Sequence, residues 1–192
     1  MSLSSDGTIV AIGSYGYNGS QGLVRVYERD TNEAIGWKQL GSNIVGENSN
    51  DWFGFSLSLS SDGTIVAIGA RLHAGNGTYA GHVRIYERDT NEALGWKQLG
   101  SDIHGEAEGD WCGESVSLSN NGTIVAISGH KNDGNSGNAE DNRGHVRLFS
   151  YDGSTWSQIG SDIDGEAAED HSGNSVALSG DGKTVVIGAK YN

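Results

Sequence analysis

One sequence block recurs along this chain of 192 residues, three times in full and a fourth time in part. Tryptophans, Gly-Glu pairs, aspartates and glycines mark the block, and each marker recurs at nearly the same interval. A fixed period of about 60 residues predicts a repeat architecture, in which each unit buries its apolar faces against its neighbours. The markers are Trp37, Trp96 and Trp156; Glu47, Glu106 and Glu166; Asp51, Asp110 and Asp170; and Gly54, Gly113 and Gly173.

Four short strands are expected in the same order in each copy, and the second copy shows them most clearly. Its first segment alternates apolar and polar residues, which is the period of a strand. An Asp62-Gly63 turn follows, because this dipeptide tolerates the positive φ angles of hairpins. The next run is apolar and β-branched, as in a strand buried on both faces. The four predicted strands cover residues 55–60, 64–69, 81–86 and 95–100.

Repeated units of four antiparallel strands predict an all-β fold built from β-propeller blades, about three and a half of them in this chain. A WD40 repeat is excluded by its shorter period of about 40 to 45 residues. A kelch repeat is nearer in length, but the paired glycines of its second strand are absent. We place three blades at residues 1–53, 54–112 and 113–172, and a half blade at 173–192.

Three segments of copy two, in this order, resemble the FG-GAP repeat, and copies three and four match in register. That repeat builds the seven-bladed propellers of integrin α subunits and of many bacterial and algal surface proteins. The resemblance implies a propeller fold, a role in recognition or cell adhesion, and an extracellular or cell-surface location. The segments are residues 53–57, 62–70 and 81–86 in copy two, 113–118 and 121–128 in copy three, and 173–178 and 181–189 in copy four.

The best-known site of that family, a calcium loop between the first two strands, does not carry over. Calcium takes six to eight oxygen ligands, several of them carboxylates. The equivalent turns here hold one carboxylate (Asp6, Asp62 or Asp181) or, at Asn121, none. We interpret them as plain hairpin turns, and we expect neither a tightly bound metal nor a cofactor.

Residues 129–144 form the longest loop of their kind and are rich in oxygen ligands, with Asp133 and Asp141 among them. Their spacing matches no EF-hand loop. Asn, Asp, Gly and Ser are also what a solvated turn contains. The sequence favours a solvated turn and leaves cation binding open.

Trp52 and Trp111 follow the aspartates that precede each new blade, and His171 holds this position in the fourth copy. We hypothesise that the two indoles lie exposed on a rim and, with Asp133 and Asp141, form a surface for a partner. Burial of both rings as packing is the alternative.

The other markers are given structural roles. Each recurring aspartate is expected to accept backbone N–H bonds where the chain crosses between blades. The three marker tryptophans are expected to pack between blades. Arg25, Arg84 and Arg147 lie in the third strands, and we hypothesise that they pair with the recurring carboxylates of neighbouring blades. A solvated outer edge is the alternative for these arginines.

Composition and motifs exclude several classes of function. Twelve basic against 25 acidic residues give a net charge of -13, which argues against nucleic-acid binding. No run approaches the roughly 18 apolar residues of a membrane span. Nucleophile elbow, zinc spacing, P-loop and dinucleotide motifs are absent, so no catalytic residue is assigned. The six histidines are scattered, and Leu23 replaces the equivalent His82 and His145, which argues for packing.

Two functions remain. The first is a non-catalytic propeller module, or a fragment of one, that recognises a protein or glycan ligand. The second is the scaffold of a propeller enzyme whose catalytic residues lie in blades absent from this chain. Three and a half blades do not close a ring of about seven and would leave unpaired edges. We therefore expect self-association into a homodimer that completes a ring.

Overall fold

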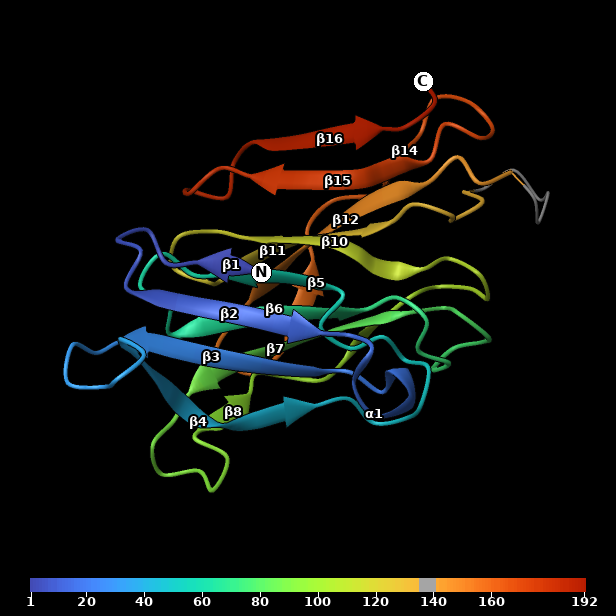
Figure 1. Ribbon diagram of the computed structural model, residues 1–192. Helices are drawn as coiled ribbons and strands as arrows, with labels where there is room; N and C mark the ends of the chain where they lie inside the picture. Colours follow the sequence, from blue (N-terminus) through green and yellow to red (C-terminus); the bar gives the residue numbers. More distant parts are fainter. Residues whose placement is uncertain (135–140) are drawn as a thin grey trace.

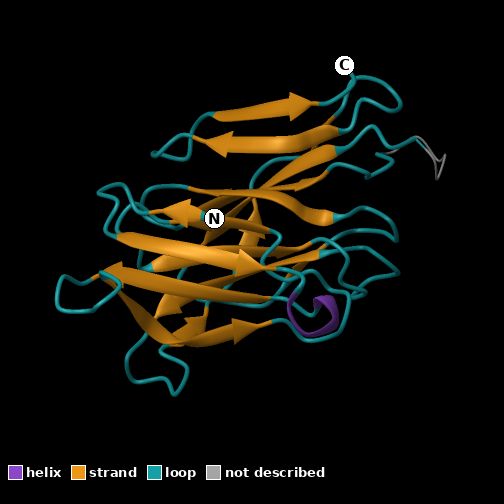
Figure 2. Ribbon diagram, in the orientation of Figure 1, coloured by secondary structure: helices purple, strands orange, loops and turns teal. Residues whose placement is uncertain are grey.

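A computed structural model describes residues 1–134 and 141–192, and the middle of the long loop predicted at 129–144 lies outside these residues. Four antiparallel sheets stand side by side, as Figures 1 and 2 show. The single short helix of the described residues is α1 (Tyr17–Ser20). No helix of the described part is long and apolar enough to cross a membrane.

Within each sheet the strands follow one another in chain order, which is the meander of a propeller blade. The first sheet is β1 (Ser2–Leu3), β2 (Ile9–Ser14), β3 (Leu23–Arg29) and β4 (Trp37–Val45). The second is β5 (Ser56–Leu59), β6 (Ile65–Ala70), β7 (His82–Arg88), β8 (Trp96–Gln98) and β9 (Ile103–His104). The third is β10 (Cys112–Leu118), β11 (Ile124–Gly129), β12 (His145–Tyr151), β13 (Trp156–Gln158) and β14 (Ile163–Asp164), and the fourth is β15 (Ser172–Leu178) and β16 (Val185–Ala189).

The four strands predicted for copy two are confirmed as β5 to β8. The sequence missed β9, which resumes the outer edge of the sheet by pairing with β7. Between β8 and β9 the chain turns at Gly100, whose φ is +67°. In the first sheet the same break is only a shift of register, so β4 runs through it as one strand.

The core lies between sheets, because the second strand of a blade is covered on both faces. In β6, Val66, Ile68 and Ala70 pack toward the first sheet, whereas Ala67 packs toward the third. This alternation explains why the run is apolar throughout. Each fully buried Val or Ile contributes about 1.5 to 3 kcal/mol.

Polar contacts between sheets repeat at equivalent positions. The Oγ atoms of Ser2, Ser58 and Ser117 each accept the backbone N–H of a leucine in the next sheet, at 2.9 Å. The indoles of Trp96 and Trp156 donate to the Leu40 and Leu99 carbonyls of the preceding sheet, at 2.9 and 2.8 Å. The prediction that these two tryptophans pack between blades is confirmed.

The turns between the first two strands are hairpin turns closed by their own side chains. Asp6 Oδ1 accepts hydrogen bonds from Ser4 Oγ, Thr8 N and Thr8 Oγ1 at 2.7, 2.9 and 2.8 Å. Asn121 accepts the same set in copy three. The hydrogen bonds from the Ser4 hydroxyl and from Thr8 lower the pKa of Asp6 to about 2.

Gly81 lies where the chain entering the third sheet passes directly against the second. Its φ is +78°, and a Cβ added there would collide with the backbone carbonyl oxygen of Cys112. This close backbone approach leaves no space for a side chain. The glycine therefore lets adjacent sheets come together.

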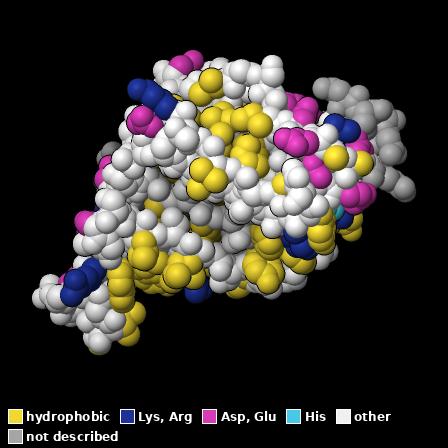
Figure 3. Space-filling view, turned by 90° about the horizontal axis from the view of Figure 1, so that it is seen from above, with side chains coloured by type: hydrophobic (Ala, Val, Ile, Leu, Met, Phe, Trp, Pro, Cys, Tyr) yellow, Lys and Arg dark blue, Asp and Glu magenta, His cyan; other side chains and the backbone are white. Residues whose placement is uncertain are grey.

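The first and last sheets carry uncovered apolar groups. On the first sheet, Ile12 is 42% exposed and Ile35 is 74% exposed, and both line an apolar hollow of about 250 Å³ with Val10, Tyr27 and Trp37. On the last sheet, Val186 is 66% exposed. Figure 3, seen from above, shows groups of uncovered hydrophobic side chains on that side.

We predict that Gly81→Ala lowers the free energy of unfolding by about 3 kcal/mol or more, because it adds a backbone clash to an unfavourable φ. Gly36→Ala is the matched control: its φ is +75°, but no atom of the described residues lies within 4 Å of an added Cβ. We expect it to lose only about 1 to 2 kcal/mol. Urea denaturation measures both, and equal losses would contradict the role of close approach.

We also predict that Asp6→Asn leaves the turn intact at neutral pH, since Asn121 makes the same bonds. The folded-state pKa of Asp6 lies below its ordinary value of 3.8. Wild-type Asp6 therefore contributes stability above about pH 4 that is lost as the pH falls toward 2. Thermal unfolding from pH 7 to 2 should show this loss in wild type and not in the variant. The reciprocal Asn121→Asp should gain it, and parallel profiles in all three proteins would refute the assignment.

Candidate functional site

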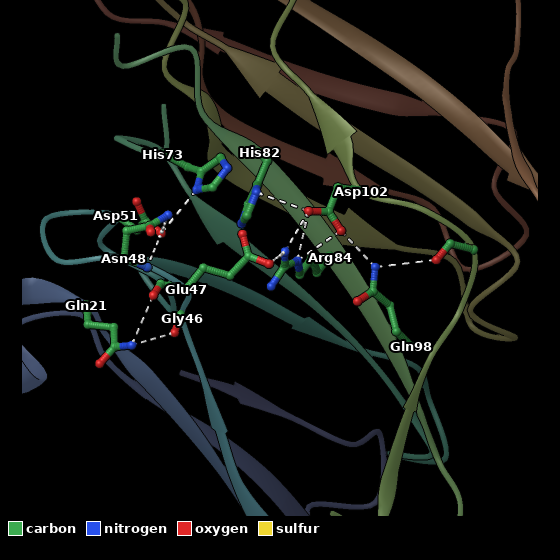
Figure 4. Close-up of polar contacts among 11 residues, drawn as sticks. Gln21, Gly46, Glu47, Asn48, Asp51, His73, His82, Arg84, Gln98 and Asp102 are labelled. Atoms are coloured by element: carbon green, nitrogen blue, oxygen red, sulfur yellow. Dashed lines mark hydrogen bonds and ion pairs between the residues drawn. The ribbon is translucent and has the colours of Figure 1, made fainter. Parts of the chain in front are cut away.

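The junction between the first two sheets is held by a guanidinium group (Figure 4). Arg84, on β7, donates to both carboxylate oxygens of Asp102 at 2.7 to 2.9 Å. It also pairs with Glu47, which lies in the crossover that follows β4 of the first sheet. At the next junction Arg147 pairs with Glu106 at 3.5 Å. The hypothesis that these arginines meet carboxylates of a neighbouring blade is confirmed for both.

Arg25 differs, because its Nε donates to Asn43 of its own sheet at 3.1 Å. The crossover aspartates behave as predicted. Asp110 Oδ2 accepts the backbone N–H groups of Glu106 and Ala107, both at 2.8 Å. Asp51 and Asp170 each accept one equivalent bond at 2.8 Å. These carboxylates shape the chain where it passes from blade to blade.

Three histidines that looked scattered in the sequence lie together in the second sheet. His82 begins β7, His104 ends β9, and the two are paired across the strands. His73, from the loop after β6, stacks on His82 with ring centroids 3.9 Å apart. Burial, followed by the charges of His73 and Arg84, lowers the pKa of His82 to about 3, so its ring is neutral.

Aromatic rings and cations alternate along one rim of the sheets. The Arg71 guanidinium carbon lies 4.7 Å from the ring centroid of Trp52, 3.9 Å from that of Phe55 and 4.6 Å from that of Trp111. On the first sheet Tyr15 stacks on Trp52 at 5.2 Å. Contacts of this kind contribute about 0.5 to 2 kcal/mol each. The Arg71 side chain thus connects the crossover that carries Trp52 with the crossover that carries Trp111.

The row continues toward the last sheet. Lys131 Nζ lies 4.3 Å from the Trp111 centroid, and the His130 ring lies 5.4 Å from it. His171 meets Tyr191 at 5.2 Å, and Lys190 Nζ lies 4.8 Å from that ring. We call the described residues of this row the rim row: Tyr15, Trp52, Phe55, Arg71, Trp111, His130, Lys131, His171, Lys190 and Tyr191.

A cavity of about 360 Å³ opens in the rim row between the third and last sheets. Arg71, Lys131 and Lys190 line it, and Glu114, held by Arg71 at 2.6 Å, is the one carboxylate among its described lining residues. Burial and then the charges of His171, Arg71, Lys131 and Lys190 lower the pKa of His130 to about 4. The cavity is therefore locally positive on a strongly acidic protein.

The backbone directs the rings of the rim row. Trp52, Trp111 and His171 have φ angles of +58°, +56° and +50°, which L-residues seldom adopt. Each such residue costs about 1 to 2 kcal/mol. The same conformation in three copies shows that the crossover imposes it, with the side chain turned to the rim as a consequence.

The structure brings together two of the four residues that the sequence proposed for a partner surface. Trp52 and Trp111 flank Arg71 and are partly buried. Asp141 is buried and accepts Arg143 Nε at 2.8 Å, and Asp133 accepts the Asn142 N–H at 3.0 Å. Neither aspartate lines the rim cavity.

The sequence missed the basic residue types of the rim row. Arg71, His130 and Lys190 occupy one repeat position, directly after the second strand, where copy one has Tyr15. Superposing the copies would have shown a long or basic side chain at this place. The signal that was missed is the residue type at this one repeat position, which forms no local sequence motif.

The family comparison bears on the second copy. Residues 46–86 match the FG-GAP repeat. This confirms the resemblance over the stretch from the first crossover to the third strand of copy two. None of the curated proteins matches the sequence.

Solved structures support the fold. The chain is similar to hydrazine synthase of Kuenenia stuttgartiensis, with a TM-score of 0.59 and 15% identity over 100% of this chain and 58% of that one. It is also similar to a putative TolB from Agrobacterium tumefaciens, with a TM-score of 0.51 and 16% identity over 98% and 57%. The chain thus spans less than two thirds of either structure. At these identities the likeness concerns the fold alone, and the predicted β-propeller architecture is confirmed.

Proposed function

We propose that this chain is a non-catalytic β-propeller module that recognises an acidic ligand at the cavity of the rim row. The observation that carries the proposal is the gathering of Arg71, Lys131 and Lys190 in one cavity, which Trp111 also lines, on a protein of net charge -13. A carboxylate entering the cavity would meet several donors and exchange water for charge-assisted hydrogen bonds. The aromatic rings offer apolar surface to the rest of the ligand.

The match to the FG-GAP repeat supports a place outside the cell or on its surface, where such repeats serve recognition and adhesion. Two kinds of ligand share the required chemistry: an oligosaccharide of uronic acids and a peptide rich in Asp and Glu. Both present carboxylates spaced along a chain. The rim row, which runs from the first sheet to the last, suits an extended ligand.

We predict that Lys131→Glu combined with Lys190→Glu lowers affinity for the acidic ligand by about tenfold or more, because one charge-assisted hydrogen bond contributes about 1.5 to 3 kcal/mol. Lys38→Glu combined with Lys97→Glu is the control: it changes net charge equally at two exposed positions outside the cavity. Titration calorimetry would use oligogalacturonate, an Asp/Glu peptide and a neutral oligosaccharide. Binding of either acidic probe identifies the ligand class. Binding of neither, or equal loss in both double variants, would overturn the proposal.

We further propose that two copies associate through the uncovered faces of their end sheets. Trp96 and Trp156 each donate an indole hydrogen bond to a backbone carbonyl of the preceding sheet. Trp37 holds the equivalent position in copy one and has no hydrogen bond of this kind among the described residues. Exposed Ile12 and Ile35 lie beside it. A second copy supplies sheets of the same repeat, whose faces already pack on one another within one chain.

Light scattering is expected to give a mass twice the 20.1 kDa of one chain. Ile35→Asp should shift the mass toward the monomer, because it places a charge in the covered face. Leu94→Asp is the matched control at the same position of copy two, where Leu94 is 49% exposed. The mass of a single chain for wild type would refute pairing, and so would a dimer insensitive to Ile35→Asp.

A further inference from the structure

Three imidazoles in the second sheet, His73, His82 and His104, converge on one point. Each offers a ring nitrogen, and these nitrogens all lie within 4.8 Å of one another. The ring of His104 lies 6.0 Å from that of His73 and 5.9 Å from that of His82, centroid to centroid. Two nitrogen ligands on a tetrahedral zinc ion are about 3.3 Å apart. The rings would have to rotate, and His73 and His82 to leave their stacked arrangement, to bring one nitrogen of each histidine to this spacing around one ion.

The histidine at the centre lacks hydrogen-bond partners. His82 is 1% exposed, and neither of its ring nitrogens makes a hydrogen bond to any described residue. Within the same part of the chain, the buried Nδ1 of His104 is also without one. A buried polar atom left unpaired is costly, and native structures seldom keep one without a reason. A bound metal ion would satisfy these nitrogens.

The surroundings suit a divalent cation. His73 Nδ1 lies 3.0 Å from Asp51 Oδ2 (Figure 4), which leaves Nε2 as the ligand atom. A carboxylate behind a metal-binding histidine fixes its orientation and raises its basicity. His82 Nδ1 lies 3.5 Å from Asp102 Oδ2. Asp102 and Glu47 also pair with the guanidinium of Arg84.

The propeller fold does not require this trio. In copy one the places of His82 and His104 are held by Leu23 and Val45, which pair in the same way across the strands. In copy three the place of His73 is held by Asn132, which hydrogen-bonds the crossover Asp110. His145 is as buried as His82, but its partner across the strands is Asp164. Only copy two has a histidine at all three places.

We propose that His73, His82 and His104 form a binding site for one divalent transition-metal ion of the zinc type. Three histidine nitrogens are a known zinc donor set, in which the fourth position is taken by water or an exogenous ligand. His104 and Asp102 also line a second cavity, of about 440 Å³. The fourth position thus has access to solvent. The expectation from sequence, that no metal binds tightly, is replaced by this proposal.

The test is zinc binding to protein that carries no polyhistidine tag and has been stripped of metal. Titration calorimetry and elemental analysis after gel filtration are expected to give one zinc ion per chain, with micromolar affinity or tighter. Cobalt(II) in place of zinc should show the intense visible absorption of a four-coordinate ion. Absence of a stoichiometric site in wild type would overturn the proposal without affecting the acidic-ligand site.

The chain itself supplies the substitutions. His73→Asn, His82→Leu and His104→Val introduce residues that the other copies carry at these places, and each should weaken zinc binding at least tenfold. The matched control is His145→Leu, which removes an equally buried histidine one blade away, from a separate group with Glu106 and Asp162, and should leave the affinity of the three-histidine site unchanged. Circular dichroism verifies that each variant folds. If His82→Leu does not fold, the zinc affinity of His104→Val tests the site instead. Unchanged affinity in the three variants, or equal loss in His145→Leu, would refute the site.

Discussion

The packing of one sheet on the next is the interaction on which the rest of this structure depends. No sheet of the described chain has a core of its own, because the second strand packs against neighbouring sheets, on both faces in the inner sheets and on one face in the first and last. Val66, Ile68 and Ala70 serve one interface, and Ala67 serves the other. A single blade is therefore stable only when neighbouring blades pack against it, as in other repeat proteins. The uncovered faces at both ends of the array follow from the same rule.

Close packing of sheets also determines where chemistry can occur. The crossover aspartates hold the backbone between blades through hydrogen bonds, and glycines such as Gly81 allow the backbones of adjacent sheets to come close. Arg84 and Arg147 are held between carboxylates of two blades. The charges of these two arginines and of their carboxylate partners therefore serve to hold the blades together. The residues that we propose for ligand recognition lie where successive crossovers and loops meet at the rim, and there Arg71 bridges two blades through aromatic rings.

Duplication allows equivalent positions to take different roles on one backbone. The place held by Leu23 in the first sheet is held by His82 and His145 in the next two, with the same strand pairing. An apolar side chain and an imidazole thus serve equally as packing there. Because this position accepts either residue, the fold does not require the three histidines of the second blade. The copies provide internal controls that a protein without repeats lacks.

The sequence alone determined the period, the four strands of each complete copy and the plain hairpin turns, and it suggested the pairing of arginines with carboxylates that the structure shows for Arg84 and Arg147. These follow from local signals: alternation, Asp-Gly turns and residues that recur at fixed spacing. The tertiary structure decided which side chains meet across the rim and inside a blade. Arg71 lies in the loop after β6 and Trp111 in the crossover before β10, and β7 and β8 separate His73 from His104 along the chain. No local pattern encodes such pairings, since they arise only when the crossovers bring successive strands and sheets into contact.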